Sequence, residues 1–117
     1  MKKNLLGQQG ENQAKKYLKN KGYSFLSQNF QTKLGEIDLI FQHNNTVVFV
    51  EVKTRKNTTQ GLPQEAVTPH KLKKITKVAQ QYINLESLNH LPARIDVVAI
   101  DHSSTPSKIT HLENVSI

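Results

Sequence analysis

Two strand-like stretches separated by a short polar turn limit the fold of this chain more than any other feature of its sequence. The first stretch runs from Glu36 to Phe41 and the second from Thr46 to Thr54, and both are rich in β-branched or aromatic residues. Between them lie His43, Asn44 and Asn45, which favour tight turns. The sequence therefore predicts a β-hairpin over these residues.

The segments on either side of this hairpin predict an α/β domain. A helix is expected from about Gly10 to Lys21 with Gly22 as its stop, then a strand over Tyr23 to Phe30 and a turn over Gln31 to Leu34. After the hairpin we expect a loop from Asn57 to Pro63, a helix that begins at Thr68-Pro69 and carries the apolar stripe Leu72, Ile75, Val78, Ala79, Tyr82 and Ile83, a strand over Ile95 to Ile100, and an optional edge strand over Lys108 to Val115. The order α-β-β-β-α-β, with an optional last strand, predicts one central mixed sheet flanked by helices.

The composition favours a single domain, residues 1–117, that works in the cytoplasm. A chain of 117 residues is long enough to bury one core. Cysteine is absent, which excludes disulfides and thiolate metal sites. Met1 to Gly7 lacks the apolar stretch of a signal peptide, and the longest apolar run, Val47 to Val50, is far shorter than the ~18 residues of a membrane-spanning helix. We therefore expect neither export nor membrane insertion.

The charge of the chain points to nucleic acid as a partner. Its 16 Lys and Arg residues outnumber its 9 Asp and Glu residues, for a formal net charge of +7. A basic surface attracts polyanions by releasing their counterions. Other chemistries have no support, because the histidines lack zinc-ligand spacing and the chain has neither a nucleophile elbow nor a phosphate-binding glycine loop.

The predicted hairpin carries a charged face. If its turn is centred between Asn44 and Asn45, Asp38 lies opposite Glu51 and Glu36 lies opposite Lys53. Because side chains alternate along a strand, one face holds Glu36, Asp38, Glu51, Lys53 and Arg55, and the other holds Ile37, Leu39, Val50 and Val52. The hairpin thus predicts one chemical face and one core face.

Two opposed carboxylates need a counter-charge. At ~5 Å and an effective dielectric constant of about 20 they repel by roughly 3 kcal/mol. Oxygen ligands alone suit Mg²⁺ or Mn²⁺, and Lys53 would then orient an attacking water beside the ion. The alternative is a solvated face on which Glu36 pairs with Lys53 and Asp38 pairs with Arg55. The apolar run Val47–Val50 argues for a covered sheet and against that alternative.

Glu11 has two interpretations on spacing alone. It shares a helical stripe with Ala14 and Leu18, so it would face the sheet and complete a metal site. A glutamate in the first turn of a helix is also favoured by the helix dipole, and spacing by itself favours this second interpretation.

The run Gly35-Glu36-Ile37-Asp38-Leu39-Ile40, followed by Val48-Phe49-Val50-Glu51-Val52-Lys53-Thr54-Arg55, resembles the YraN-like family of small bacterial proteins in the PD-(D/E)XK nuclease superfamily. The resemblance extends from about Gly10 to Ile100. It implies a restriction-endonuclease-like fold, similar to that of archaeal Holliday junction resolvases. In that pattern Asp38, Glu51 and Lys53 match the motif, and Glu11 matches the acid of the first helix. Ile37 stands where the superfamily has the proline of its name.

From the residues and the resemblance together we expect a metal-dependent endonuclease that hydrolyses phosphodiester bonds in DNA, with branched or recombination intermediates among its substrates. Asp38 and Glu51 would hold Mg²⁺ or Mn²⁺, Glu11 would assist directly or through water, and Lys53 would position the attacking water.

The remaining charged residues leave alternatives open. Arg55 and Lys71 either bind phosphates or are ordinary solvated cations. Glu36 is either an auxiliary acid or the partner of Lys53. The alternative function is a non-catalytic nucleic-acid-binding module of the same fold. A homodimer is expected only by analogy with enzymes that cut symmetric junctions.

Overall fold

The computed structural model describes residues 5–56 and 67–115. Its elements in chain order are α1 (Leu5–Asn20), β1 (Ser24–Thr32), β2 (Gly35–His43), β3 (Thr46–Arg55), α2 (Pro69–Leu85), β4 (Ala93–Asp101) and β5 (Lys108–Leu112). This is the order expected from the sequence, and the optional last strand is present.

Some element boundaries differ from the expectation. Helix α1 begins at Leu5, well before Gly10, and the exposed Leu5 shows that its first turn lies outside the core. The helix stops as expected, since Gly22 takes a positive φ of 90°. Strand β1 continues to Thr32, which pairs with Gly35, so the predicted turn shrinks to two residues. The predicted loop at 57–63 lies outside the described residues.

The five strands form one mixed sheet in the order β1-β2-β3-β4-β5. Strands β3 and β4 are parallel and are connected through α2, whereas the other neighbours are antiparallel. The hairpin turn between β2 and β3 uses Asn44 and Asn45 with φ of 50° and 62°, as a two-residue turn between twisted strands requires. Leu39 pairs with Val50, which confirms the predicted hairpin register.

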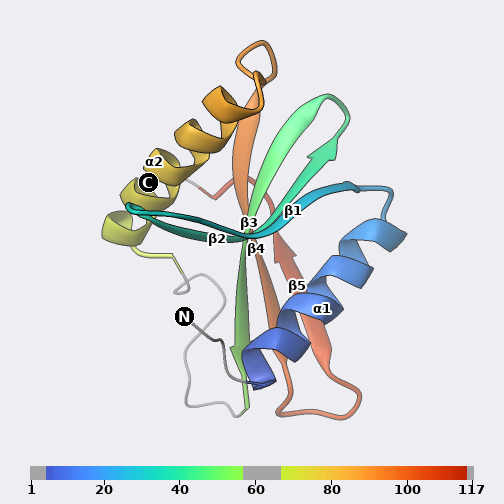
Figure 1. Ribbon diagram of the computed structural model, residues 1–117. Helices are drawn as coiled ribbons and strands as arrows, with labels where there is room; N and C mark the ends of the chain where they lie inside the picture. Colours follow the sequence, from blue (N-terminus) through green and yellow to red (C-terminus); the bar gives the residue numbers. More distant parts are fainter. Residues whose placement is uncertain (1–4, 57–66, 116–117) are drawn as a thin grey trace.

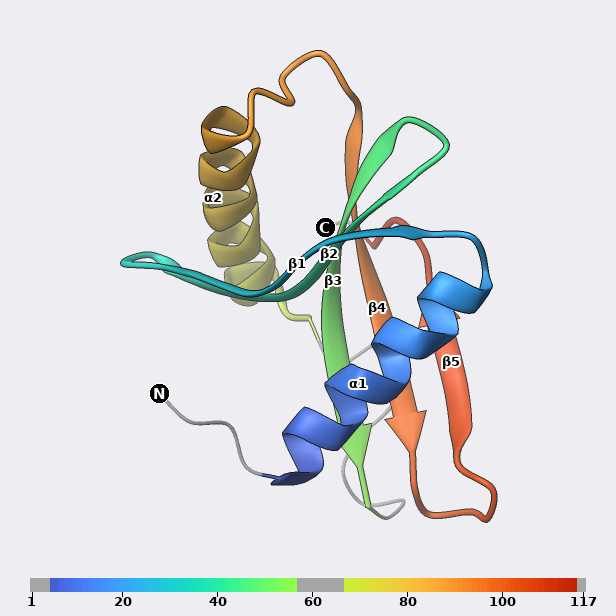
Figure 2. The same ribbon diagram turned by 45° about the vertical axis from the view of Figure 1, so that its right-hand side comes forward.

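The two helices cover opposite faces of the sheet (Figures 1 and 2). On the α1 face the core consists of Ala14, Leu18, Tyr23, Leu39, Phe41, Val48, Val50, Val98 and Ile100. On the α2 face it consists of Ile37, Ile40, Val47, Phe49, Ile75, Val78, Ala79 and Tyr82. Both faces of the sheet therefore contribute to the core.

Ile37 does not share the core of Leu39 and Val50, which corrects the predicted core face. It packs in the cluster beneath α2, whereas Leu39 packs beneath α1. Figure 1 shows the reason: β1 and β2 twist away from β3, and the tip of their hairpin extends beside α2. Simple alternation along a flat strand does not describe this segment.

Neither helix in the described part of the chain combines the length and apolar character needed to cross a bilayer.

Candidate functional site

Asp38 and Glu51 lie close together where strands β2 and β3, which form the second hairpin, separate from each other. The β2–β3 pairing ends at Leu39 and Val50, one pair before these two acids. Beyond it, the backbone N–H of Val52 donates to Asp38 Oδ2 at an N···O distance of 2.8 Å. The carboxyl group of Glu51 is hydrogen-bonded to that of Asp38. The acids are therefore neighbours as predicted, although the backbone no longer pairs them.

Both acids are nearly inaccessible, with exposures of 8% for Asp38 and 7% for Glu51. Burial and the adjacent Asp38 raise the pKa of Glu51 from 4.5 to about 7, although the Lys71 ammonium lowers it. A buried carboxylate pair that takes up a proton at neutral pH is a site that requires positive charge.

Lys71 supplies part of that charge from the first turn of α2. Thr68 caps this helix by accepting from the backbone N–H of Lys71 at 3.2 Å, and Pro69 follows it, as the sequence predicts. From this position Lys71 Nζ lies 2.8 Å from Glu51 Oε2 while its side chain is half exposed. Lys71 is thus a cation of the acidic site, and its contact with phosphate stays a prediction.

Glu11 faces the sheet and is only 3% exposed. Because α1 begins at Leu5, Glu11 lies beyond the first turn, so the helix-dipole interpretation is wrong. The neighbouring Gly10 permits a close approach to β3, since a Cβ atom there would collide with the Thr54 hydroxyl. The lack of a side chain at Gly10 therefore brings Glu11 down onto the sheet.

The amide of Asn29 links Glu11 to Glu36. With its nitrogen facing the two acids, Asn29 donates to Glu11 Oε1 and to Glu36 Oε1, both at 3.0 Å. Glu36 itself pairs with Gln31 of β1, and the β2–β3 pairing ends before it reaches Glu36. The predicted register of Glu36 opposite Lys53 is therefore wrong.

The acids fall into two groups: Asp38 with Glu51, and Glu11 with Glu36. Within residues 5–56 and 67–115, no three His, Asp or Glu residues are arranged to hold a metal ion together. Mg²⁺ commonly uses only one or two carboxylates and keeps several waters. The pair Asp38 and Glu51 therefore fits that ion by its chemistry, and the part that Glu11 plays stays a prediction.

The basic residues that follow Glu51 on β3 differ in their surroundings. Lys53 lies two residues beyond Glu51, hence on the same side of the strand, and it is half-buried. The guanidinium of Arg55 is 2.7 Å from Asp101 Oδ2 on β4, its parallel neighbour. Hydrogen bonds from Arg55 and Ser103 hold the pKa of Asp101 well below its usual range. Arg55 is therefore engaged with β4, and a phosphate would have to compete with Asp101.

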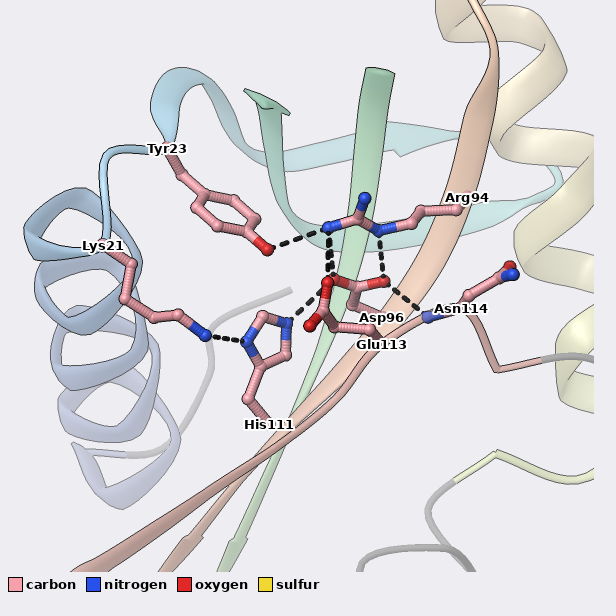
Figure 3. Close-up of polar contacts among 7 residues, drawn as sticks. All are labelled: Lys21, Tyr23, Arg94, Asp96, His111, Glu113 and Asn114. Atoms are coloured by element: carbon pink, nitrogen blue, oxygen red, sulfur yellow. Dashed lines mark hydrogen bonds and ion pairs between the residues drawn. The ribbon is translucent and has the colours of Figure 1, made fainter. Parts of the chain in front are cut away.

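A second polar cluster, whose role the sequence leaves unassigned, surrounds the fully buried Asp96 (Figure 3). Its carboxylate accepts from Arg94 Nε at 3.0 Å, from the Asn114 backbone N–H at 2.9 Å, and lies 2.8 Å from His111 Nε2. Burial alone would raise the pKa of Asp96, but these hydrogen bonds outweigh it and lower the pKa. The contacts tie β4 to β5 and to the C-terminal turn.

The same cluster reaches the end of α1. Arg94 Nη2 donates to the Tyr23 hydroxyl at 2.8 Å, and Lys21 Nζ lies 2.9 Å from His111 Nδ1. Figure 3 shows these side chains converging from the turn between α1 and β1, from β4 and from β5. The available signal was a charged residue inside the buried strand over Ile95 to Ile100, which requires partners.

Comparison with known proteins finds a family throughout most of the chain. A family model described as "Uncharacterised protein family UPF0102" matches residues 10–100. A UPF0102 protein of Caldanaerobacter subterraneus is 44% identical over 96% of this chain and 94% of its own length. A UPF0102 protein of Vibrio campbellii is 50% identical over 86% of this chain and 84% of its own length. The matched residues include every candidate residue of the acidic site.

Proposed function

The chain belongs to family UPF0102, the YraN-like family that its hairpin resembles, and we propose that it is a metal-dependent nuclease that hydrolyses phosphodiester bonds in DNA on a restriction-endonuclease-like fold. The observation that carries this proposal is the buried, hydrogen-bonded pair of Asp38 and Glu51, which already recruits the Lys71 ammonium as a counter-charge. The formal net charge of +7 supports a polyanionic substrate.

The donor set at this pair consists of carboxylate oxygens, which suits Mg²⁺ or Mn²⁺. Asp38 and Glu51 would hold the ion, with Glu11 acting through water. When bound, the ion supplies positive charge that stabilises the phosphate in the transition state.

The chain's own groups have separate parts in the reaction. The Val52 N–H fixes the orientation of the Asp38 carboxylate by donating to Oδ2. The Lys53 ammonium, on the same side of β3 as Glu51, would donate to the attacking water and orient it. Lys71, which donates to Glu51 in this structure, would donate to a phosphate oxygen of bound DNA.

The test is cleavage of labelled branched, single-stranded and duplex DNA in Mg²⁺ and in Mn²⁺. The informative variants are Asp38→Asn and Lys53→Met, which keep the size of each side chain. The controls are Glu86→Gln and Lys108→Met, two exposed positions outside the site. We expect cutting by the wild type and both controls, and a loss of at least about a hundredfold in Asp38→Asn and Lys53→Met.

The alternative is a binding module of the same fold. It would show as tight, salt-sensitive DNA binding without cutting by the intact protein in either metal. Equal cutting by wild type and Asp38→Asn would contradict the proposed site even if the protein is a nuclease. The branched substrates in the panel test the expectation of recombination intermediates, and the mass of the protein in solution tests the expected homodimer.

A further inference from the structure

Asn29 differs from the rest of β1 in its backbone. Its φ of 55° lies in the left-handed region, which asparagine enters more readily than other residues with a side chain. The flanking pairs are Gln28 with Leu39 and Phe30 with Ile37, so Asn29 lies across from Asp38. The left-handed conformation therefore occurs beside the acidic site, within a strand.

The Asn29 amide connects two acids that would otherwise repel each other. An NH₂ group has two hydrogens and can donate one to each of two acceptors. Here the acceptors are Glu11 Oε1 and Glu36 Oε1, both at 3.0 Å. Asn29 itself is exposed, so core packing does not explain its identity. Its contacts are directed at the carboxylates.

We propose that Asn29 is a positioning residue of the candidate site. Asn29 lies across from Asp38 in the β1–β2 ladder, and its amide holds Glu11 and Glu36 side by side. It thereby sets the contribution that Glu11 makes through water to cation binding. This inference rests on the proposed function, because it assumes that Asp38 and Glu51 hold the cation. Hydrogen-bond partners of metal ligands typically change metal affinity by about ten- to a hundredfold, and Asn29, which acts through Glu11 and a water, is expected at the lower end of that range.

The chain offers a matched pair of variants for the test. Asn29→Gly keeps the left-handed backbone and removes only the amide, since glycine adopts positive φ freely. Asn45→Gly is the control, because Asn45 also has a positive φ of 62° but lies in the exposed turn of the second hairpin. Mn²⁺ affinity is measured on the metal-free proteins by the electron paramagnetic resonance signal of free Mn²⁺, together with melting temperatures.

We expect Asn29→Gly to bind Mn²⁺ about tenfold more weakly than the wild type, and Asn45→Gly to bind it equally well. Because the amide acts through Glu11, Asn29→Gly should have no further effect in a Glu11→Gln background. The side-chain NH₂ resonances of Asn29 should shift in Glu11→Gln and in Glu36→Gln, and should stay in place in Glu86→Gln.

The outcomes separate this inference from the proposed function. Equal Mn²⁺ affinity of wild type and Asn29→Gly overturns the role of Asn29 and leaves the nuclease proposal standing. The same holds if Asn29→Gly weakens Mn²⁺ binding as much in the Glu11→Gln background as in the wild type. Side-chain NH₂ resonances of Asn29 that stay in place in both Glu11→Gln and Glu36→Gln overturn the role of Asn29 as well. A wild type that binds no Mn²⁺ overturns the proposed function itself. Weaker Mn²⁺ binding by Asn29→Gly with an unchanged melting temperature supports a positioning role for Asn29. A merely structural role would change both the Mn²⁺ affinity and the melting temperature.

Discussion

Replacing Glu51 by glutamine removes a charge from a position where burial and Asp38 both oppose ionisation. The pKa of Glu51 is raised from 4.5 to about 7 in the folded protein, and this shift already includes the attraction of Lys71. One pKa unit corresponds to about 1.4 kcal/mol, so ionisation of Glu51 lowers the free energy of unfolding by about 3 kcal/mol. Glutamine resembles the protonated acid and avoids this loss.

The sign of the effect follows from the direction of the shift. Because the folded-state pKa is the higher one, the stabilising contribution is complete below the unfolded-state value of 4.5 and is lost as the pH rises through about 7. In urea denaturation, wild type and Glu51→Gln should therefore be equally stable at about pH 4. At about pH 8.5 the variant should be more stable by about 3 kcal/mol.

The control is Glu86→Gln, the same change at an exposed position. A Glu51→Gln protein that is no more stable than the wild type at high pH would refute the reasoning, as would a gap that widens toward low pH. Mg²⁺ adds a further test above about pH 8. At about a hundredfold excess over its Kd it should stabilise the wild type by about 3 kcal/mol and should have little effect on Glu51→Gln.

Two further predictions concern packing and the buried cluster. Gly10→Ala should lower the free energy of unfolding by about 1–3 kcal/mol, because the added methyl group meets Thr54. The control, Gln13→Ala on the exposed side of the same helix, should change it by under about 0.5 kcal/mol. Equal melting temperatures of Gly10→Ala and the wild type would contradict the close approach of α1 to β3. Asp96→Asn should lower the free energy of unfolding, measured by urea denaturation, by about 3 kcal/mol because it leaves Arg94 without its buried counter-charge. A decrease no larger than that of Asp101→Asn would contradict the importance of the buried charge.

The features that the sequence predicts correctly depend on local signals. The turn at Asn44 and Asn45 determines the hairpin register, and through it the proximity of Asp38 and Glu51. The helix start at Thr68 likewise follows from a cap and a proline, and it positions Lys71 in the first turn. These features need only a few neighbouring residues, so a single sequence suffices to infer them.

The errors arise where distant segments decide the geometry. Twisting of β1 and β2 away from β3 moves Ile37 to the other core and ends the strand pairing before Glu36. An early start of α1 takes Glu11 out of the first turn, whereas the stripe that it shares with Ala14 and Leu18 faces the sheet as one of the two interpretations had it. Asn29 carried a usable signal, because asparagine is disfavoured in strands, but its partners on α1 and β2 are visible only in three dimensions.

The two outer strands of the sheet differ in what they contribute. Strand β1 supplies Asn29, which contacts the acids of the candidate site, whereas β5 supplies His111, which contacts the buried Asp96. A partner that paired with β1 would lie beside Asn29. A shift of Asn29 on binding would then change the positions of Glu11 and Glu36. A partner that paired with β5 would lie beside His111, which contacts Asp96. The two edges of the sheet thus lie beside different clusters, β1 beside the acids Glu11 and Glu36 and β5 beside the buried Asp96.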